Sequence, residues 1–334
     1  MNVTICGGGN IAHALAAVLS LTDDVSVLTR RPELWCRTLE YRKGAGAYKR
    51  GRALHEISDD SSIVGDASLV IVSVPRFAIN EILGRIGPSL HKGQTVAFIP
   101  APSGLEAIAA DLKQRYGVET VGFQRVPYIA RIVEYGRIVT LSDDRAIHKT
   151  VMSDSMDAHF WDEYFISRFG GRIEHLSSFF AFTFSNANPL LHPARLMVLL
   201  DNPWYDRMPL FYEEWTDDSS ELYVKSDCEM LAAMKKCPEI DISRDYESAL
   251  DHYGVKSIPE LTQKIRSIPS FIGIQAPYKL CNGRYIPDLA SRYFTEDVAY
   301  GTVRIQGLAR NMGVKTPTID MFVKRINSLL HVNQ

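Results

Sequence analysis

The fold of this chain is decided close to its start by the stretch Val3-Thr4-Ile5-Cys6-Gly7-Gly8-Gly9-Asn10-Ile11-Ala12. Its apolar first half predicts a buried strand over Asn2–Cys6, and the many small residues in 11–21 predict a closely packed helix. The turn between them fits the pattern G-x-G-x-x-G/A. A strand, a glycine turn and a helix in this order are typical of a doubly wound α/β sheet.

The glycine turn predicts a site for the pyrophosphate of a dinucleotide. Gly7 permits the tight turn, Gly9 lets the backbone approach the phosphates, and the small Ala12 lets the helix pack close to the strand. The helix opens with Asn10 and Ile11, where free N–H groups and the helix dipole favour an anion. The alternative is a glycine-rich turn that binds no ligand.

Residues up to about 150 alternate between short apolar runs and helical patterns. Further strands are predicted at 25–28, 69–74, Thr95–Phe98 and 120–122, and helices at 77–86 and 104–116. Continuously apolar strands favour a parallel sheet that is covered on both faces. From about residue 180 longer helical patterns take over, at 193–200, 219–236, Ile258–Ser267 and 297–312. The sequence therefore predicts an α/β fold, with a Rossmann-type doubly wound sheet in residues 1–185 and a mostly α-helical catalytic domain in residues 186–334.

The end of the second strand favours NADP over NAD. An acidic residue about twenty positions beyond the glycine turn reads the ribose 2′-hydroxyl of NAD. Here the strand ends in Leu28-Thr29-Arg30-Arg31, with no acid at its carboxyl end. Two guanidinium groups at this place suit a 2′-phosphate. The alternative is that both arginines belong to a solvated turn.

A later strand ends in Ser73-Val74-Pro75 and runs directly into a helix. Such a strand end would line the nicotinamide side of the cofactor cleft, so these three residues are predicted cofactor contacts. The alternative is that the proline only marks the boundary between strand and helix.

One histidine has an unusual context. His192 lies in Asn188-Pro189-Leu190-Leu191-His192-Pro193, near the point where the α/β pattern gives way to the helical one. Cofactor and substrate usually meet at such a junction. Reduction of a C=N or C=O group needs a proton partner that works near neutral pH, and histidine is such a group. The alternative is a buried structural histidine.

A second candidate segment is Arg292-Tyr293-Phe294-Thr295-Glu296-Asp297. One of its carboxylates could orient the imidazole of His192, and Arg292 could bind a substrate carboxylate. The alternative is that Thr295 caps a helix whose first turn carries the two acids, and that Arg292 makes a surface ion pair.

Composition excludes several classes of function. The net charge is -2 in 334 residues, and the basic cluster in 42–52 is interpreted as a flexible, solvated loop, so we expect no nucleic-acid partner. No apolar stretch is long enough for a membrane span, and five cysteines in no metal or redox spacing indicate free thiols and no metal site. We expect a cytoplasmic protein with small-molecule substrates, and a homodimer is the commonest assembly for such a protein.

Together these segments resemble the opine dehydrogenases, the octopine/nopaline dehydrogenase family. The likeness rests on the glycine turn, on Val74-Pro75, on Asn188 with His192-Pro193, and on Glu296-Asp297-Val298 with Gly301. These motifs span nearly the whole chain and occur in the order that the family has.

The resemblance implies a reaction. Members condense the amine of an amino acid with the keto group of a 2-oxo acid and reduce the imine with NAD(P)H. It implies His192 as general acid/base, Asp297 as its supporting carboxylate, Arg292 as a contact of a substrate carboxylate, and Asn188 as a positioning group. The Thr-Arg-Arg strand end departs from the acidic end of NAD-using members. Two alternatives remain open, a ketopantoate-reductase-like enzyme and a non-catalytic NADP-sensing protein.

Overall fold

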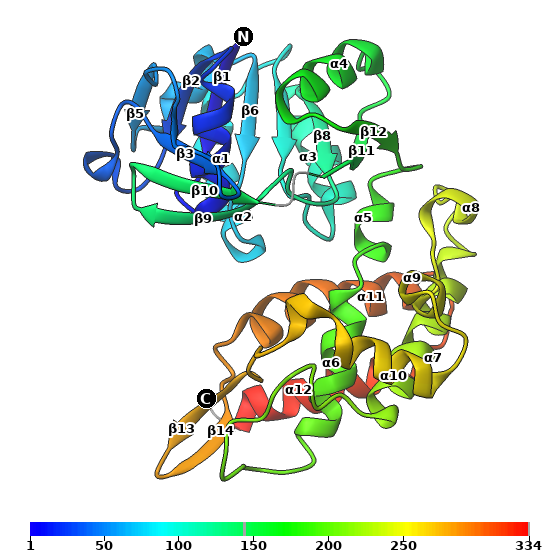
Figure 1. Ribbon diagram of the computed structural model, residues 1–334. Helices are drawn as coiled ribbons and strands as arrows, with labels where there is room; N and C mark the ends of the chain where they lie inside the picture. The colour runs from blue at the N-terminus through cyan, green and yellow to red at the C-terminus, as the bar shows by residue number, and fades with distance from the viewer. Residues whose placement is uncertain (143–144, 333–334) are drawn as a thin grey trace. The chain divides into compact units, whose positions relative to one another are not determined.

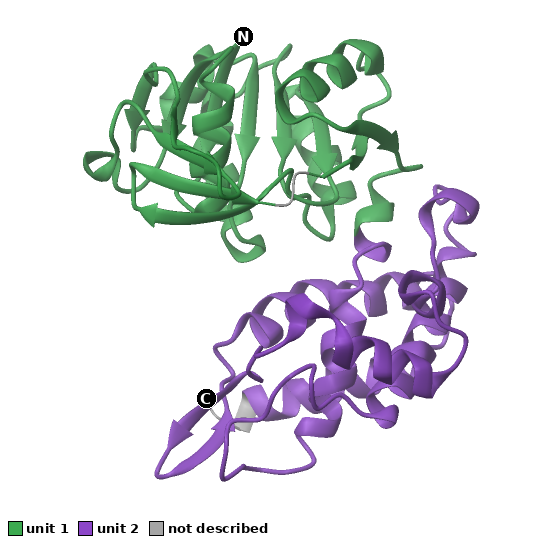
Figure 2. Ribbon diagram, viewed as in Figure 1, with its two compact units in different colours: residues 1–182 green, residues 183–334 purple. Residues whose placement is uncertain are grey.

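The computed structural model describes residues 1–142 and 145–332, and the chain divides into two compact units, residues 1–182 and 183–334 (Figure 2). The sequence placed the boundary after residue 185. That position lies in the short link between α5 (Phe180–Phe184) and α6 (Asn188–Leu199).

Six parallel strands form most of the large sheet of unit 1. They are β1 (Asn2–Cys6), β2 (Asp24–Leu28), β5 (Glu56–Ser58), β6 (Leu69–Val72), β7 (Thr95–Phe98) and β8 (Glu119–Phe123). Their spatial order is β5-β2-β1-β6-β7-β8, which is the doubly wound order 3-2-1-4-5-6 (Figure 1). Beyond β8 the sheet continues with the antiparallel β11 (Ile147–Met152) and then β12 (Arg172–His175). The predicted fold class is confirmed.

Helices alternate with these strands. Three of them were predicted, α1 (Asn10–Leu19), α2 (Arg76–Ile86) and α3 (Leu105–Tyr116), whereas α4 (Ala158–Phe169) was not. All residues of β6 and β7 are buried, which explains why these strands are apolar without alternation. The strand order reverses between β1 and β6, so a cleft opens at the carboxyl ends of these two strands.

A second, four-stranded sheet packs on α1 and was not predicted. Its order is β4 (Lys49–Arg50), β3 (Glu40–Lys43), β10 (Ile138–Ser142) and β9 (Ile129–Glu134). The interpretation of 42–52 as a flexible loop is therefore wrong in part, because strand pairing orders β3 and β4. Lying between two sheets, α1 is buried all round from Ala12 to Leu19, which explains its small residues.

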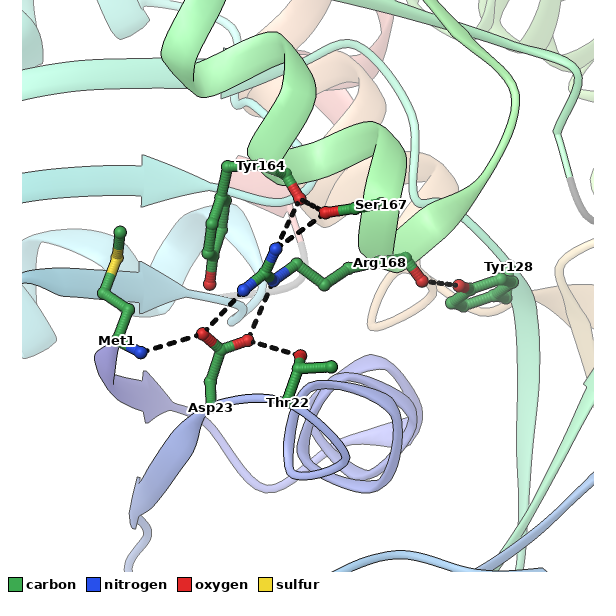
Figure 3. A network of polar contacts seen from close by, with 7 residues as sticks. All are labelled: Met1, Thr22, Asp23, Tyr128, Tyr164, Ser167 and Arg168. Carbon is green, nitrogen blue, oxygen red and sulfur yellow. Dashed lines mark hydrogen bonds and ion pairs between the residues drawn. The ribbon is translucent and has the colours of Figure 1, made fainter.

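A buried carboxylate joins α4 to the turn before β2 (Figure 3). The Asp23 carboxylate accepts two hydrogen bonds of 2.9 Å from the guanidinium of Arg168, and others from Thr22 and the ammonium of Met1. The guanidinium also lies over the ring of Tyr164, 3.8 Å from its centroid. Burial opposes ionisation, but the hydrogen bonds from Arg168 and Thr22 outweigh it and hold the pKa of the Asp23 carboxyl below its usual value.

Unit 2 is mostly helical, as predicted. It contains α6, α7 (Asp217–Met234), α8 (Ile242–Asp245), α9 (Ala249–Tyr253), α10 (Ile258–Ser267), the π-helical segment η5 (Tyr293–Thr302), α11 (Val303–Asn311), α12 (Pro317–Val332) and a hairpin of β13 (Tyr278–Cys281) and β14 (Arg284–Pro287). Its core holds Trp215, Phe211, Phe294 and Phe322. None of the described helices of either unit has the length and apolarity needed to cross a bilayer, and all five cysteines are free thiols.

Two helix predictions in unit 2 need correction. The helix expected at 193–200 begins earlier, at Asn188, so Pro193 lies inside it. The helix expected at 297–312 begins at Tyr293 as η5, after Arg292. Thr295 therefore does not cap it, and its hydroxyl instead donates to the carbonyl oxygen of Ser291 at 3.2 Å.

Cofactor cleft and candidate catalytic centre

Unit 1 carries a cleft of about 340 Å³ at the carboxyl ends of β1, β2 and β6. The backbone extends the strand pairing just beyond the strands, where Gly7 N–H donates to Leu28 and Ser73 N–H donates to Cys6, both at 3.0 Å. Of the predicted cofactor contacts, eight line this cleft: Gly7, Gly9, Thr29, Arg30, Arg31, Ser73, Val74 and Pro75. It is the place where doubly wound folds bind dinucleotides.

The glycines form a cradle that side chains would fill. A Cβ on Gly7 would lie 2.5 Å from the carbonyl oxygen of Ser73, and one on Gly8 would lie 2.8 Å from the hydroxyl of Tyr135. At Gly9 an added Cβ would meet nothing within 4 Å, so its backbone faces open space at the start of α1. A close-fitting turn beside an open helix N-terminus suits a pyrophosphate.

Positive charge predominates among the residues that line the cleft at the end of β2 and on α2. Three arginines line the cleft, Arg30, Arg31 and Arg85, against one acid, Glu81. Arg30 makes no hydrogen bond or ion pair within residues 1–142 and 145–332, while Arg31 lies over the ring of Tyr135, 4.6 Å from its centroid. The guanidinium groups of Arg30 and Arg31 are therefore available to an anionic ligand, whereas that of Arg85 donates to the carbonyl oxygen of Asp59 at 2.8 Å.

Two predicted cofactor contacts do not line the cleft with their side chains. The Asn10 side chain turns to the second sheet, where its Oδ1 accepts from the N–H of Ile132 at 2.8 Å. Ile11 packs against the core of unit 1. Any contribution of these two residues to cofactor binding comes from their backbone N–H groups at the start of α1.

Eight further residues line the cleft and were not predicted as cofactor contacts: Gly8, Leu28, Phe77, Ala78, Glu81, Ile82, Arg85 and Tyr135. Tyr135 stands in the tight turn between β9 and β10, beside Gly136 with its φ of 71°. A Tyr-Gly pair between two β-branched runs is a hairpin signal that could have revealed this turn. Its place in the cleft depends on the packing of the second sheet on α1, which no local pattern encodes.

In unit 2 the predicted catalytic residues lie together. The imidazole of His192, on α6, is joined through Nδ1 to the Oδ2 atom of Asp297, on η5, at 2.8 Å. Its Nε2 lies 2.9 Å from the hydroxyl of Tyr212, a residue that the sequence did not reveal. The His192 side chain is 9% exposed and that of Asp297 19%. Because an ionised carboxylate only accepts hydrogen bonds, Nδ1 carries the proton and Nε2 accepts from the tyrosine.

Aromatic rings enclose this imidazole. The ring of Tyr293 lies 4.5 Å from that of His192, and Phe211 packs edge-on at 5.5 Å. Burial raises the pKa of the Tyr293 hydroxyl, and the nearby Asp297 adds to the shift. Phe211 and Tyr212 lie in the irregular segment between α6 and α7, and their contacts with His192 were not predicted.

The backbone of α6 and η5 sets the distance between His192 and Asp297. Gly301 of η5 faces Pro189 of α6 so closely that a Cβ on the glycine would lie 2.4 Å from the proline Cγ. Close approach of the two segments therefore requires glycine at this position. A π-helical turn is often found at functional sites, and here it carries the carboxylate.

The two predicted substrate contacts have different surroundings. Asn188 is exposed and lies one helical turn before His192, on the same face of α6. The Arg292 side chain is 84% exposed, and its Nε donates to Glu296 at 2.7 Å within the same segment. Arg292 does not contact His192, although the neighbouring Tyr293 does.

Known proteins of one family match both units. The family described as NAD/NADP octopine/nopaline dehydrogenase, alpha-helical domain, matches residues 175–330. Tauropine dehydrogenase of Arabella iricolor is 25% identical over 98% of this chain and 91% of its own. Residues 175–330 therefore belong to the helical domain of the octopine/nopaline dehydrogenase family, and the likeness to opine dehydrogenases extends over almost the whole chain. These matches identify an opine-type dehydrogenase, an oxidoreductase that acts on CH–NH groups with a nicotinamide cofactor.

Solved structures of opine dehydrogenases share the fold of this chain. An octopine dehydrogenase solved with NADH and L-arginine matches with a TM-score of 0.86 at 22% identity, over 99% of this chain and 90% of that chain. A yersinopine dehydrogenase solved with NADP⁺ matches with a TM-score of 0.75 at 14% identity, over 99% and 91%. The two relatives were thus solved with different nicotinamide cofactors.

Proposed function

We propose that this opine dehydrogenase prefers NADPH and condenses the amine of an amino acid with a 2-oxo acid, with His192 as general acid/base. The observation that carries the proposal is the buried pair of His192 and Asp297, joined at 2.8 Å. A carboxylate on Nδ1 fixes the tautomer and leaves Nε2 as the atom that exchanges protons. Asp297 also stabilises the imidazolium when His192 is protonated.

The cofactor preference rests on the cleft wall in unit 1. When bound, the reduced nicotinamide supplies the hydride that reduces the imine carbon. Gly7, Gly9 and the backbone N–H groups of Asn10 and Ile11 would hold its pyrophosphate. Arg30 and Arg31 would take the 2′-phosphate of NADPH, since the end of β2 offers no acid to the ribose hydroxyls of NADH. Thr29, Ser73, Val74 and Pro75 also line this cleft and are proposed to contact the cofactor.

On the substrate side, Asn188 and Arg292 are proposed contacts for different reasons. Asn188 shares the exposed face of α6 next to His192. Arg292 adjoins Tyr293, whose ring contacts the imidazole, and its exposed guanidinium can exchange the surface pair with Glu296 for a substrate carboxylate. Small anionic substrates suit these two residues.

The test follows oxidation of NADPH and NADH with pyruvate, 2-oxoglutarate and glyoxylate, each alone and paired with a panel of amino acids. We expect turnover only when both substrates are present, and a loss of ~10²-fold or more for His192→Ala. His159→Ala, at an exposed histidine, is the matched control. Consumption of NADPH by a keto acid alone would instead identify a simple ketone reductase.

The cofactor proposal has a separate test. Arg30→Ala/Arg31→Ala should weaken NADPH binding while NADH binding changes little, because the 2′-phosphate alone distinguishes the two cofactors. Arg172→Ala, at an exposed arginine elsewhere in unit 1, is the control. Equal weakening of both cofactors would contradict a role of these arginines at the 2′-phosphate.

A further inference from the structure

The hydroxyl of Tyr212 occupies the proton-exchanging face of His192. It lies 2.9 Å from Nε2, while Nδ1 is held by Asp297. A substrate atom can therefore exchange a proton with Nε2 in only two ways. Either the tyrosine moves away, or the tyrosine hydroxyl passes the proton on. The surroundings of the tyrosine decide between these possibilities.

The ring of Tyr212 is clamped on several sides. It stacks on Phe271 with a centroid distance of 4.0 Å and an interplanar angle of 16°, and it lies nearly parallel to Trp215 at 6.2 Å. Phe211 packs edge-on at 4.8 Å, and the residue as a whole is 5% exposed. Swinging the ring away would break these contacts in a densely packed interior.

The backbone that carries Tyr212 is fixed as well. The buried guanidinium of Arg195, one turn after His192 on α6, donates through Nε to the carbonyl oxygen of Phe211 at 3.0 Å. The helix that positions the histidine thus also positions the tyrosine. Burial raises the pKa of the Tyr212 hydroxyl, with a further contribution from Tyr293, so the hydroxyl keeps its proton at neutral pH.

We propose that Tyr212 is the terminal proton donor and acceptor of the reaction, linked through His192 to Asp297. This inference rests on the proposed function of His192. The tyrosine hydroxyl contacts the substrate, and the imidazole stores the proton behind it. A relay explains why a fixed hydroxyl covers Nε2, whereas a gate would need a mobile ring.

The relay accounts for loss of water from the carbinolamine formed by the amine and the keto group. The C–O bond breaks, and the departing oxygen takes the proton of the Tyr212 hydroxyl. The tyrosine oxygen takes the Nε2 proton of the His192 imidazolium in the same step, and the nitrogen lone pair forms the C=N bond. Water, an iminium ion, neutral Tyr212 and neutral His192 result. Proton transfer in the opposite direction prepares the amine. The Tyr212 oxygen takes a proton from the ammonium group of the incoming substrate while its own proton passes to Nε2, which converts His192 to the imidazolium.

Tyr212→Phe tests the proposal, because it removes the hydroxyl and keeps the stacked ring. We expect the single-turnover rate of imine formation and reduction to fall by ~10²-fold or more. Tyr278→Phe is the matched control: that tyrosine is also buried in unit 2, but its hydroxyl donates to the backbone carbonyl of Leu199 at 3.0 Å. The control should stay close to wild type.

Isotope effects separate a relay from a structural role. When the relay is lost, proton transfer should limit the rate. The kinetic isotope effect of NADPH deuterated at C4 should then fall towards unity, and the solvent kinetic isotope effect should rise. Misplaced substrate would slow hydride transfer instead and keep the effect of NADPH deuteration. A wild-type rate in Tyr212→Phe, or a slow variant with a full effect of NADPH deuteration, would overturn the proposal. If wild type reduces no imine, the proposed function itself fails, independently of Tyr212.

Discussion

The hydroxyl of Thr302 donates a hydrogen bond of 2.6 Å to the carbonyl oxygen of Pro189. In an uninterrupted α-helix this carbonyl would pair with the N–H group of residue 193, but Pro193 has none. Thr302 therefore supplies the donor that α6 lacks. Because Thr302 lies one π-helical turn after Asp297, the same bond fastens the carboxylate-bearing segment beside the helix of His192.

Thr302→Val should lower both stability and activity. It keeps the branched shape and leaves the buried Pro189 carbonyl without a donor, which costs roughly 1–3 kcal/mol. The activity should fall because η5 is no longer tied to α6. Urea unfolding and steady-state rates measure the two effects. Thr295→Val, at an exposed threonine of the same segment, is the control, and equal losses in both variants would contradict this role.

Alanine at two glycines of the cofactor turn should give opposite phenotypes. In Gly7→Ala the new Cβ meets the Ser73 carbonyl at 2.5 Å and the backbone is held at a φ of 150°, so the free energy of unfolding should fall. In Gly9→Ala the Cβ points into open space, so stability should stay near wild type while the cofactor Kd rises. Thermal unfolding and a fluorescence titration with NADPH check the pair. A destabilised Gly9→Ala protein with an unchanged Kd would show that the cradle is misassigned.

Acid should destabilise unit 1 through His13. Burial lowers the pKa of this imidazole to about 4 from 6.5, although its hydrogen bond to Gly9 opposes the shift. The unfolded chain therefore binds more protons between pH 6.5 and about 4, so stability is full above this window and falls as the pH drops through it. Each pH unit between the two pKa values corresponds to about 1.4 kcal/mol, so the free energy of unfolding should fall by about 3 kcal/mol across this window.

The measurement is the urea midpoint of unit 1 against pH. His13→Gln removes the titrating group and should flatten the slope within this window. His159→Gln changes a histidine whose side chain is 83% exposed, and should leave the slope as it is. Parallel slopes in wild type and His13→Gln would contradict the assignment.

Arg168→Met should cost about 3 kcal/mol, because it leaves the buried Asp23 carboxylate without its strongest partner. Asp23→Asn in the same protein should recover part of the loss, so the two effects are not additive. The stabilisation by this pair is fully present above pH 3.8, the ordinary pKa of an aspartate. It should be lost as the pH falls from there through the lower pKa of Asp23 in the folded protein. Arg172→Met, at an exposed pair with Glu174, should change stability by less than ~1 kcal/mol. Full additivity of the Asp23 and Arg168 substitutions would refute the coupling.

Local patterns in the sequence predicted much of the fold. A glycine turn after an apolar strand and the continuously apolar run of β6 reflect rules that act within a few residues, so both were readable. The hairpin of β9 and β10 was missed, because its strands alternate weakly and owe their order to packing on α1. Helix limits shifted at Asn188 and Tyr293, where tertiary contacts override the local start signals.

The sequence by itself determined which chemical groups this enzyme has: a glycine turn after the first strand, two arginines at the end of β2, and a histidine and an acid in the helical part. Only the tertiary structure decided which of them meet. Asp297 reaches His192 across 105 positions of the chain, and Tyr212 covers Nε2 from an irregular segment. Such contacts arise when helices pack closely, as α6 and η5 do where Gly301 faces Pro189. That packing depends on the shape of the whole core rather than on any single stretch of sequence.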